Sequence, residues 1–314
     1  MSEKSLSWKR YLVMMAILLL VGVFLGGTVF AAEKIVLKKY PDMKIGFTTQ
    51  NFLQPLPVSL ENAKKLVDWA SNQGFAWIEY RDPSAKLTLN ECKQLAAYAK
   101  GKKLEVGYAA QIGILDPEFS EIFSRGVANA AVFEGPKTFR TLVAGAEFNP
   151  DPKKTGWSLN QLSKLVKKAN LAANVAKSKD VQYVAENSTA ALKGEGITSF
   201  GMTEFFANVN SNMGWQMDTA NFFAGIRVLP RPEEAQAFLE RFIGKLYYVH
   251  VKSSSKEHKS TDVLEENELP FDIIFALLSK SKVNYLALEL NQQPKLEDCQ
   301  NNLMKSIEFL KKNY

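Results

Sequence analysis

Four side chains able to bind a metal stand at the ends of apolar stretches of the sequence. They are Glu186, Asp218, His250 and Glu289. A helix-like segment precedes each of these stretches. Three carboxylates and one imidazole form a donor set suited to one divalent ion, Mn²⁺, Mg²⁺, Co²⁺ or Zn²⁺, and unsuited to metals that prefer thiolates. The sequence therefore predicts a metal site, provided that the fold brings the four ends together.

Such a site would support proton transfer in a sugar. A divalent ion can hold two adjacent sugar oxygens and stabilise an enediolate. Glu186 and Glu289 would face each other across the sugar, and one would remove a proton beside the carbonyl while the other returns it. His250 matters most to this interpretation, because the chain has 2 histidines and the other, His258, lies in a polar stretch.

Four further residues are candidates for binding the substrate. Asn221 follows Asp218 closely enough to reach the same place, and Lys252 follows His250. Lys252 could bind a sugar hydroxyl or a phosphate, or could be a charge on the rim. Glu79 ends another apolar stretch, where a salt bridge is the alternative role, and a solvated side chain is the alternative for His258.

The elements that must position these residues alternate between strand-like and helix-like segments. The strands are apolar almost throughout, as in parallel strands buried on both faces. The expected strands are 44–49, 75–80, 104–109, 139–144, 181–186, 214–218, 246–251 and 285–290. The expected helices are 59–72, 88–100, 116–130, 158–177, 202–209, 232–243, 271–279 and 296–311.

Eight such units predict an α/β protein, a (β/α)₈ TIM barrel, with an open doubly wound sheet as the alternative. The C-terminal ends of barrel strands carry active sites, and the strands ending in the four candidate ligands are neighbours in a closed barrel. No Gly-x-Gly-x-x-Gly motif follows a strand and no Gly-x-x-x-x-Gly-Lys loop is present, so nucleotide binding has no support.

Residues 1–32 have the pattern of a signal peptide. A positive start precedes an apolar run over 11–25 that is short for a membrane span, and Val29-Phe30-Ala31 approximates a small-x-small cleavage pattern. We therefore expect two parts, 1–32 as signal peptide or membrane anchor and 33–314 as the barrel. The expected location is periplasmic or secreted, and the alternative is an inner-membrane protein anchored by residues 11–31.

Composition narrows the classes of function. The 314-residue chain is 46% hydrophobic, which is ample for a barrel core, and its formal charge is +6. Its basic residues are scattered and form no block interleaved with aromatics, so we expect no nucleic-acid partner. The 2 cysteines, Cys92 and Cys299, lie at helical spacing from leucines and are expected to be small core side chains. The sequence does not indicate an oligomeric state.

The chain resembles the xylose isomerase-like barrel superfamily, the sugar phosphate isomerase/epimerase group, over residues 43–312. The segments that carry the resemblance are Val184-Ala185-Glu186-Asn187, Asp218-Thr219-Ala220-Asn221, Val249-His250-Val251-Lys252 and Leu288-Glu289. The resemblance implies that Glu186, Asp218, His250 and Glu289 bind one divalent metal, and that the two glutamates act as acid and base.

This sequence departs from the family pattern near the substrate. Many relatives have His where this chain has Asn221, and Asp where it has Ser253. A Gly-rich loop common before the penultimate helix is replaced here by residues 266–270. The metal ligands are intact while the residues expected around the substrate differ, so the resemblance predicts the metal more firmly than any particular sugar.

The expected function is an exported metal-dependent isomerase or epimerase that acts on a small sugar. A lyase that eliminates from an oxidised sugar by the same metal chemistry is one alternative, and a carbohydrate-binding barrel without turnover is another. A hydrolase of the endonuclease IV type, which needs a histidine-rich cluster of three zinc ions, is excluded because the chain has 2 histidines. A membrane is an expected partner only through an uncleaved N-terminal segment.

Overall fold

Residues 33–314 form one compact unit in the computed structural model. The structure describes residues 33–144, 156–187, 192–193, 200–223, 232–255, 260–266 and 269–314. The expected signal or anchor segment, 1–32, lies outside the described residues. Within the described ranges, no helix combines the length and the hydropathy needed to cross a bilayer.

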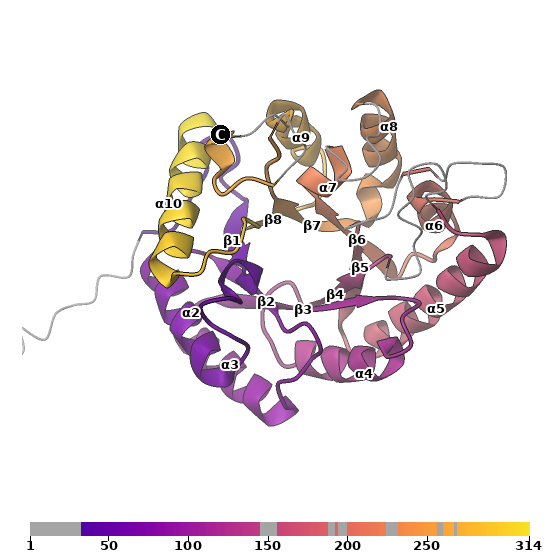
Figure 1. Cartoon of the computed structure of the whole chain (residues 1–314), viewed down its shortest axis with the longest axis horizontal. Coiled ribbons are helices and arrows are strands. Elements are labelled where there is room, and N and C mark those ends of the chain that lie inside the picture. The colour runs from indigo at the N-terminus through magenta and orange to yellow at the C-terminus, as the bar shows by residue number, and fades with distance from the viewer. Residues whose placement is uncertain are drawn as a thin grey trace, which may run out of the picture. The chain divides into compact units, whose positions relative to one another are not determined.

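Eight parallel strands close into a barrel in their order along the chain (Figure 1). The strands are β1 (Lys44–Thr48), β2 (Trp77–Arg81), β3 (Glu105–Gly113), β4 (Thr138–Leu142), β5 (Gln182–Glu186), β6 (Met213–Asp218), β7 (Leu246–Val251) and β8 (Tyr285–Leu288). Closure is made by β1, which pairs with both β2 and β8. The predicted (β/α)₈ barrel is confirmed, and the doubly wound sheet is wrong because an open sheet would leave two unpaired edges.

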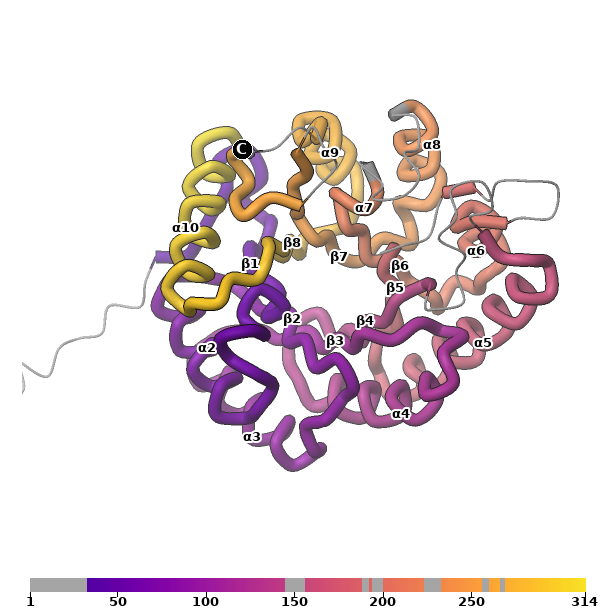
Figure 2. The backbone as a smooth tube through the Cα atoms, in the orientation of Figure 1, coloured from indigo at the N-terminus to yellow at the C-terminus, as the bar shows by residue number. Residues whose placement is uncertain are grey.

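Helices surround the ring of strands, and the tube runs once around the barrel from indigo to yellow (Figures 1 and 2). The main helices are α2 (Leu60–Asn72), α3 (Leu89–Gly101), α4 (Phe119–Ala130), α5 (Leu159–Ser178), α6 (Met202–Asn208), α8 (Pro232–Phe242), α9 (Phe271–Leu278) and α10 (Leu296–Asn313). Thr88 and Ser158 cap α3 and α5 in capping boxes.

Four short helical segments have no counterpart among the expected elements. They are η1 (Thr49–Phe52), α7 (Thr219–Phe223), η2 (Ile243–Lys245) and η3 (Leu264–Glu266). Two of them directly follow strands, η1 after β1 and α7 after β6. They therefore turn the chain at the end of the barrel where the candidate ligands lie.

The barrel interior has an apolar middle layer between polar and charged side chains at its two ends. At the N-terminal end, Lys44 Nζ donates to Glu105 at 2.7 Å and to Tyr285 at 3.0 Å. The middle is apolar and is formed by Trp77, Val184, Tyr248 and Ala287. Gly46 is required beside Trp77, since a Cβ there would lie 2.5 Å from the indole Cδ1. Glu79, Arg140 and His250 are buried above this layer, towards the C-terminal ends.

Outside the barrel, apolar side chains pack between strands and helices. Both cysteines are free and buried there, as expected: Cys92 in α3 and Cys299 in α10. Burial raises the pKa of the Cys92 thiol to about 12. This thiol is therefore a core side chain and not a nucleophile at neutral pH.

Candidate metal centre

The four predicted metal ligands converge. Glu186, Asp218, His250 and Glu289 are all buried, and each offers one ligand atom within 4.8 Å of the others. Glu186 and Asp218 are the last residues of β5 and β6, His250 lies in β7, and Glu289 follows β8. Register explains the meeting, because Asp218 pairs directly with His250 across β6 and β7.

His250 is oriented by a carboxylate from the opposite wall. Its Nε2 lies 2.9 Å from Glu79 Oε2, and its Nδ1 lies 2.8 Å from Glu289 Oε2. Glu79 is itself fixed, since it accepts hydrogen bonds from Thr48 at 2.8 Å and from Tyr248 at 2.5 Å. A carboxylate on one ring nitrogen is the arrangement that directs the other nitrogen towards a metal.

Side chains from neighbouring loops fix the strand tips. Asn187 Oδ1 accepts from the Asp218 backbone N–H at 2.8 Å, and Asn187 Nδ2 donates to the Asp218 carbonyl at 3.2 Å. Thr219 Oγ1 accepts from the Lys252 N–H at 2.9 Å. Asn51, in η1, bonds the Leu288 carbonyl at 3.1 Å and the Leu290 N–H at 2.9 Å. These bonds hold the backbone on both sides of Asp218 and Glu289.

Three permanent cations neutralise the carboxylates. Arg140 Nη1 lies 2.8 Å from Glu186 Oε2, and its Nη2 lies 3.2 Å from Glu79 Oε1. Arg81 Nη2 lies 3.2 Å from Glu289 Oε2. Lys252 Nζ lies 2.8 Å from Glu289 Oε1 and 3.6 Å from Asp218 Oδ2. Buried carboxylates persist at these positions because each has a cation within reach.

The surrounding charges shift the pKa values of the cluster. Burial lowers the pKa of His250, but Glu79 and Glu289 outweigh burial and raise it to about 9. Burial raises the pKa of Asp218 to about 6, against the opposing effect of Lys252. Burial also raises the pKa of Glu289, but Lys252 and Arg81 outweigh it and hold the pKa well below its usual range. With His250 protonated, the cations of the cluster equal the carboxylates in number. The cations are Arg81, Arg140, Lys252 and His250, and the carboxylates are Glu79, Glu186, Asp218 and Glu289.

The donor set fits a divalent ion. Glu186 Oε2, Asp218 Oδ2 and His250 Nδ1 are buried and make no well-aligned hydrogen bond within the described residues. Their nearest partners are charged groups, Arg140, Lys252 and Glu289 respectively, so these atoms are held by ion pairs and are not left without a partner. Donors that share one ion at about 2.1 Å lie at most about 4.2 Å apart, so the 4.8 Å cluster needs only a small contraction.

The other candidate residues lie at different depths. Lys252 touches the cluster, and the Asn221 backbone N–H donates to Asp218 Oδ1 at 2.8 Å. Asn221 Oδ1 has no hydrogen-bond partner among the described residues. Glu79, expected at the opening, is fully buried one layer deeper against His250. His258 lies outside the described residues.

Sequence reasoning missed Arg81 and Arg140. Arg81 is two residues after Glu79 in β2 and therefore shares its face. Arg140 is the central residue of β4. The available signal was an arginine within or beside a buried strand, since arginine is almost never buried unless it is paired. That signal predicts a carboxylate partner.

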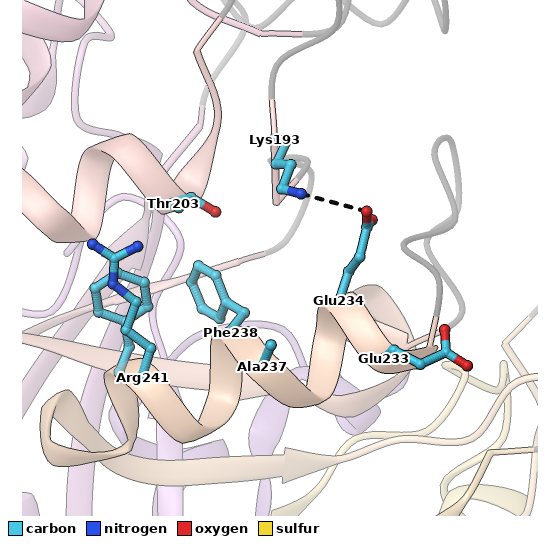
Figure 3. A pocket seen from close by; sticks show the side chains of 8 residues that line it. Lys193, Thr203, Glu233, Glu234, Ala237, Phe238 and Arg241 are labelled. Atoms are coloured by element: carbon cyan, nitrogen blue, oxygen red, sulfur yellow. Dashed lines mark hydrogen bonds and ion pairs between the residues drawn. The ribbon is translucent and has the colours of Figure 1, made fainter.

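A separate pocket of about 500 Å³ opens between α6 and α8 (Figure 3). Its base is apolar, with Phe238 and Phe242, and Lys193 and Glu234 approach at 3.4 Å across its edge. None of the four candidate ligands lines it. Because Lys193, Glu233 and Arg241 are exposed and Glu234 is only half-buried, solvent screens their interactions, and the pocket has no equivalent of the buried cluster.

Comparisons with known proteins identify solved structures that have the same fold. No protein-family profile matches the sequence, and no curated protein matches it. Solved structures match: a sugar phosphate isomerase/epimerase from Parabacteroides distasonis has 12% identity and a TM-score of 0.63 and covers 87% of this chain and 94% of its own. The chain therefore has the fold of the xylose isomerase-like TIM barrels.

Two further structures share this fold. A xylose isomerase-like TIM barrel protein from Mycobacterium smegmatis, solved in complex with magnesium, has 16% identity and a TM-score of 0.62 and covers 86% of this chain and 97% of its own. A D-psicose 3-epimerase, solved in the presence of D-fructose, has 12% identity and a TM-score of 0.58. The match covers 85% of this chain and 98% of the epimerase chain. At these identities the likeness establishes the fold, and the site must be argued from its own residues.

Proposed function

We propose that the protein is a divalent-metal-dependent isomerase or epimerase of a small sugar, acting by proton transfer beside a carbonyl. The main observation behind the proposal is that four buried residues each place one ligand atom within 4.8 Å of the others. They are Glu186, Asp218, His250 and Glu289. Related folds in an epimerase and in a magnesium complex support it. The donors are compatible with Mn²⁺, Mg²⁺, Co²⁺ or Zn²⁺.

In this proposal the two glutamates move the proton. A divalent ion held by the cluster would supply positive charge to the substrate oxygens on which negative charge develops. Glu289, which Lys252 and Arg81 keep ionised by lowering its pKa, would accept the proton from the substrate carbon. Glu186 on β5 would enter the step protonated by solvent and give its own proton to the carbon, and both glutamates would then exchange protons with water.

The substrate would lie at the C-terminal ends of the strands. Lys252, with 14% of its side chain exposed, can donate to a substrate oxygen from the edge of the cluster. The amide Oδ1 of Asn221 can accept a hydrogen bond from a substrate hydroxyl, since it has no partner in the described part of the chain. His258 remains a proposed substrate contact. Glu79 would act indirectly, by holding His250.

Deuterium exchange tests the proposal. The purified protein is assayed for bound metal and incubated with ketohexoses in D₂O, with Mn²⁺ or Mg²⁺ supplied. Deuterium at the carbon beside the carbonyl, detected by NMR, is the expected result. Glu186→Gln and Glu289→Gln should each slow incorporation about 10²- to 10⁴-fold, the usual contribution of a general acid or base.

Glu105→Gln is the matched control. It makes the same change inside the barrel but at the N-terminal end, where Glu105 pairs with Lys44. It should leave exchange unchanged. A protein that binds none of the four metals and exchanges no deuterium into any ketose would contradict the proposal, and would favour a carbohydrate-binding barrel without turnover.

A lyase acting on an oxidised sugar is the second candidate. Lys252 favours it, because a cation at the edge of the cluster could bind the carboxylate of such a substrate. Incubation with sugar acids distinguishes the two functions. Release of an unsaturated product that absorbs in the ultraviolet would identify the lyase, whereas deuterium incorporation without elimination supports the isomerase.

We also propose that residues 1–32 export the barrel to the periplasm or the medium. The supporting pattern is a positive start, a short apolar run and a small-x-small motif before residue 32. Cell fractionation followed by N-terminal sequencing tests this. A mature chain starting near Glu33 outside the cytoplasm is expected, and an uncleaved chain in the membrane fraction would identify an anchor.

A further inference from the structure

Arg81 places its guanidinium among the metal-binding carboxylates. β2 carries it to the C-terminal end of the barrel, where its side chain is only 5% exposed. Its Nη2 lies 3.2 Å from Glu289 Oε2, 3.5 Å from Glu79 Oε1 and 3.8 Å from Glu186 Oε2. Two of these three carboxylates are candidate ligands. Arg81 therefore offers positive charge to the atoms that a metal ion would use.

A metal ion and this guanidinium compete for the same oxygens. Glu289 Oε2 faces both Arg81 Nη2 and His250 Nδ1, so a metal bound between Glu289 and His250 would lie beside the guanidinium. Like charges at such distances repel strongly where little water screens them.

The bonds of the three cations indicate which one can move. Arg140 is fully buried and bridges Glu186 and Glu79. Lys252 lies on the other edge of the cluster, at Glu289 Oε1. Arg81 has one bond that leads away from the cluster, from Nη1 to Gln50 Oε1 at 3.1 Å, and its Nε has no hydrogen-bond partner in the described residues. Gln50 is half-buried in η1, so the guanidinium can turn towards it.

We infer that Arg81 is the resident counter-ion of the cluster and that a divalent metal binds in exchange for its guanidinium, which then moves to the Gln50 side. This inference rests on the metal site of the proposed function. It predicts that the wild-type protein binds its metal more weakly than its donor set alone would, because each ion must first break the Arg81–Glu289 contact.

Isothermal titration of the full chain with Mn²⁺ tests the exchange. Arg81→Met removes the charge at similar volume, and Arg81→Gln removes it while keeping a polar group. Both variants should bind Mn²⁺ about 10- to 100-fold more tightly than the wild type, the range that corresponds to one hydrogen bond between charged groups. Arg81→Lys keeps the charge and should stay within about threefold of the wild type.

Thermal unfolding supplies a second readout. Arg81→Met should lower the unfolding temperature in the absence of metal but increase the rise in unfolding temperature that metal produces. Without metal, Arg81→Met should unfold at a lower temperature than the wild type, since Glu289 loses a partner. With saturating Mn²⁺ its gain in unfolding temperature should exceed that of the wild type. Lys65→Met is the control, because Lys65 pairs with Glu61 on the exposed face of α2. It should change neither readout.

The results separate the two proposals. If the wild type binds Mn²⁺ and both neutral Arg81 variants bind equally or more weakly, the exchange is wrong and the metal site stands. If Lys252→Met tightens binding instead, Lys252 is the competing cation and the assignment to Arg81 is wrong. If the wild type and every variant fail to bind Mn²⁺, Mg²⁺, Co²⁺ and Zn²⁺, both the exchange and the metal-dependent function are overturned.

Discussion

Glu79 illustrates how one buried carboxylate can organise a site without meeting a substrate. It is fully buried and accepts hydrogen bonds from Thr48, Tyr248 and Arg140. It also lies 2.9 Å from His250 Nε2 and 3.5 Å from Arg81 Nη2. Because Arg140 and His250 outweigh the effect of burial, the pKa of Glu79 lies well below its usual range and the side chain stays ionised.

Glu79→Gln should therefore weaken metal binding although it leaves all four candidate ligand residues unchanged. The amide keeps the shape of the side chain but removes the charge that orients the ring of His250. Loss of such an outer partner typically costs 10- to 100-fold in metal affinity. Titration with Mn²⁺ measures the change, and Glu105→Gln, at the opposite end of the barrel, is the control. Equal affinity for Glu79→Gln and the wild type would contradict this role.

At the scale of elements, near-continuous apolar runs predicted the strands, and their alternation with helix-like segments predicted the barrel. Strand ends were harder. The apolar run of β2 stops at Tyr80, yet the strand continues and Arg81 pairs with Ala109 of β3. The sequence does not reveal the carboxylates that make a charged strand residue tolerable inside the barrel. Because the expected strand ended at residue 80, Glu79 was predicted at the opening of the barrel, and Arg81 was not recognised as part of the strand.

Short elements escaped prediction for a different reason. α7 covers only Thr219–Phe223, which is too short for a helical apolar pattern to repeat. Its position still matters, since it turns the chain directly after Asp218. The four ligands were predictable because residue type and strand order determine them, and Lys252 was predictable because it follows His250 in the chain. For Arg81 and Arg140 the sequence indicates that a carboxylate partner is needed, but the partner's identity depends on which side chains face each other across the barrel.

Two glycines test how tightly the helices pack on the barrel. In α4, a Cβ on Gly126 would lie 2.1 Å from the Phe139 ring of β4, whereas a Cβ on Gly101, in α3, would have no neighbour within 4 Å. Gly126→Ala should destabilise the protein by about 1–3 kcal/mol, the usual cost of overpacking. Gly101→Ala should stabilise it by up to about 1 kcal/mol through helix propensity.

Urea denaturation followed by circular dichroism measures both variants. Because both substitutions add one methyl group to a helix, the difference between them isolates the contact with Phe139. If Gly126→Ala is as stable as Gly101→Ala, α4 lies further from β4 than the structure indicates.

At the scale of the whole molecule, the segment before β1 and the C-terminal residue Tyr314 both pack against the barrel domain and bond to each other. The lead-in before β1 buries Ile35 and Leu37. The Ile35 N–H donates to the Gly74 carbonyl at 2.9 Å, and the Lys39 N–H donates to the carbonyl of the last residue, Tyr314. The Tyr314 ring stacks on Phe275 of α9, with centroids 4.3 Å apart. The lead-in is thus part of the folded domain and not a linker.

Two truncations test this closure. A chain of residues 33–314 should fold as a stable unit, because these residues form one compact unit with a large apolar core. A chain of residues 42–314 loses Ile35 and Leu37 and should be less stable by roughly 3–6 kcal/mol, at about 1.5–3 kcal/mol for each buried aliphatic side chain. The free energy of unfolding of each chain, from urea denaturation, measures the difference. Equal stability would mean that the lead-in contributes nothing to the core, and the barrel would then begin in practice at β1.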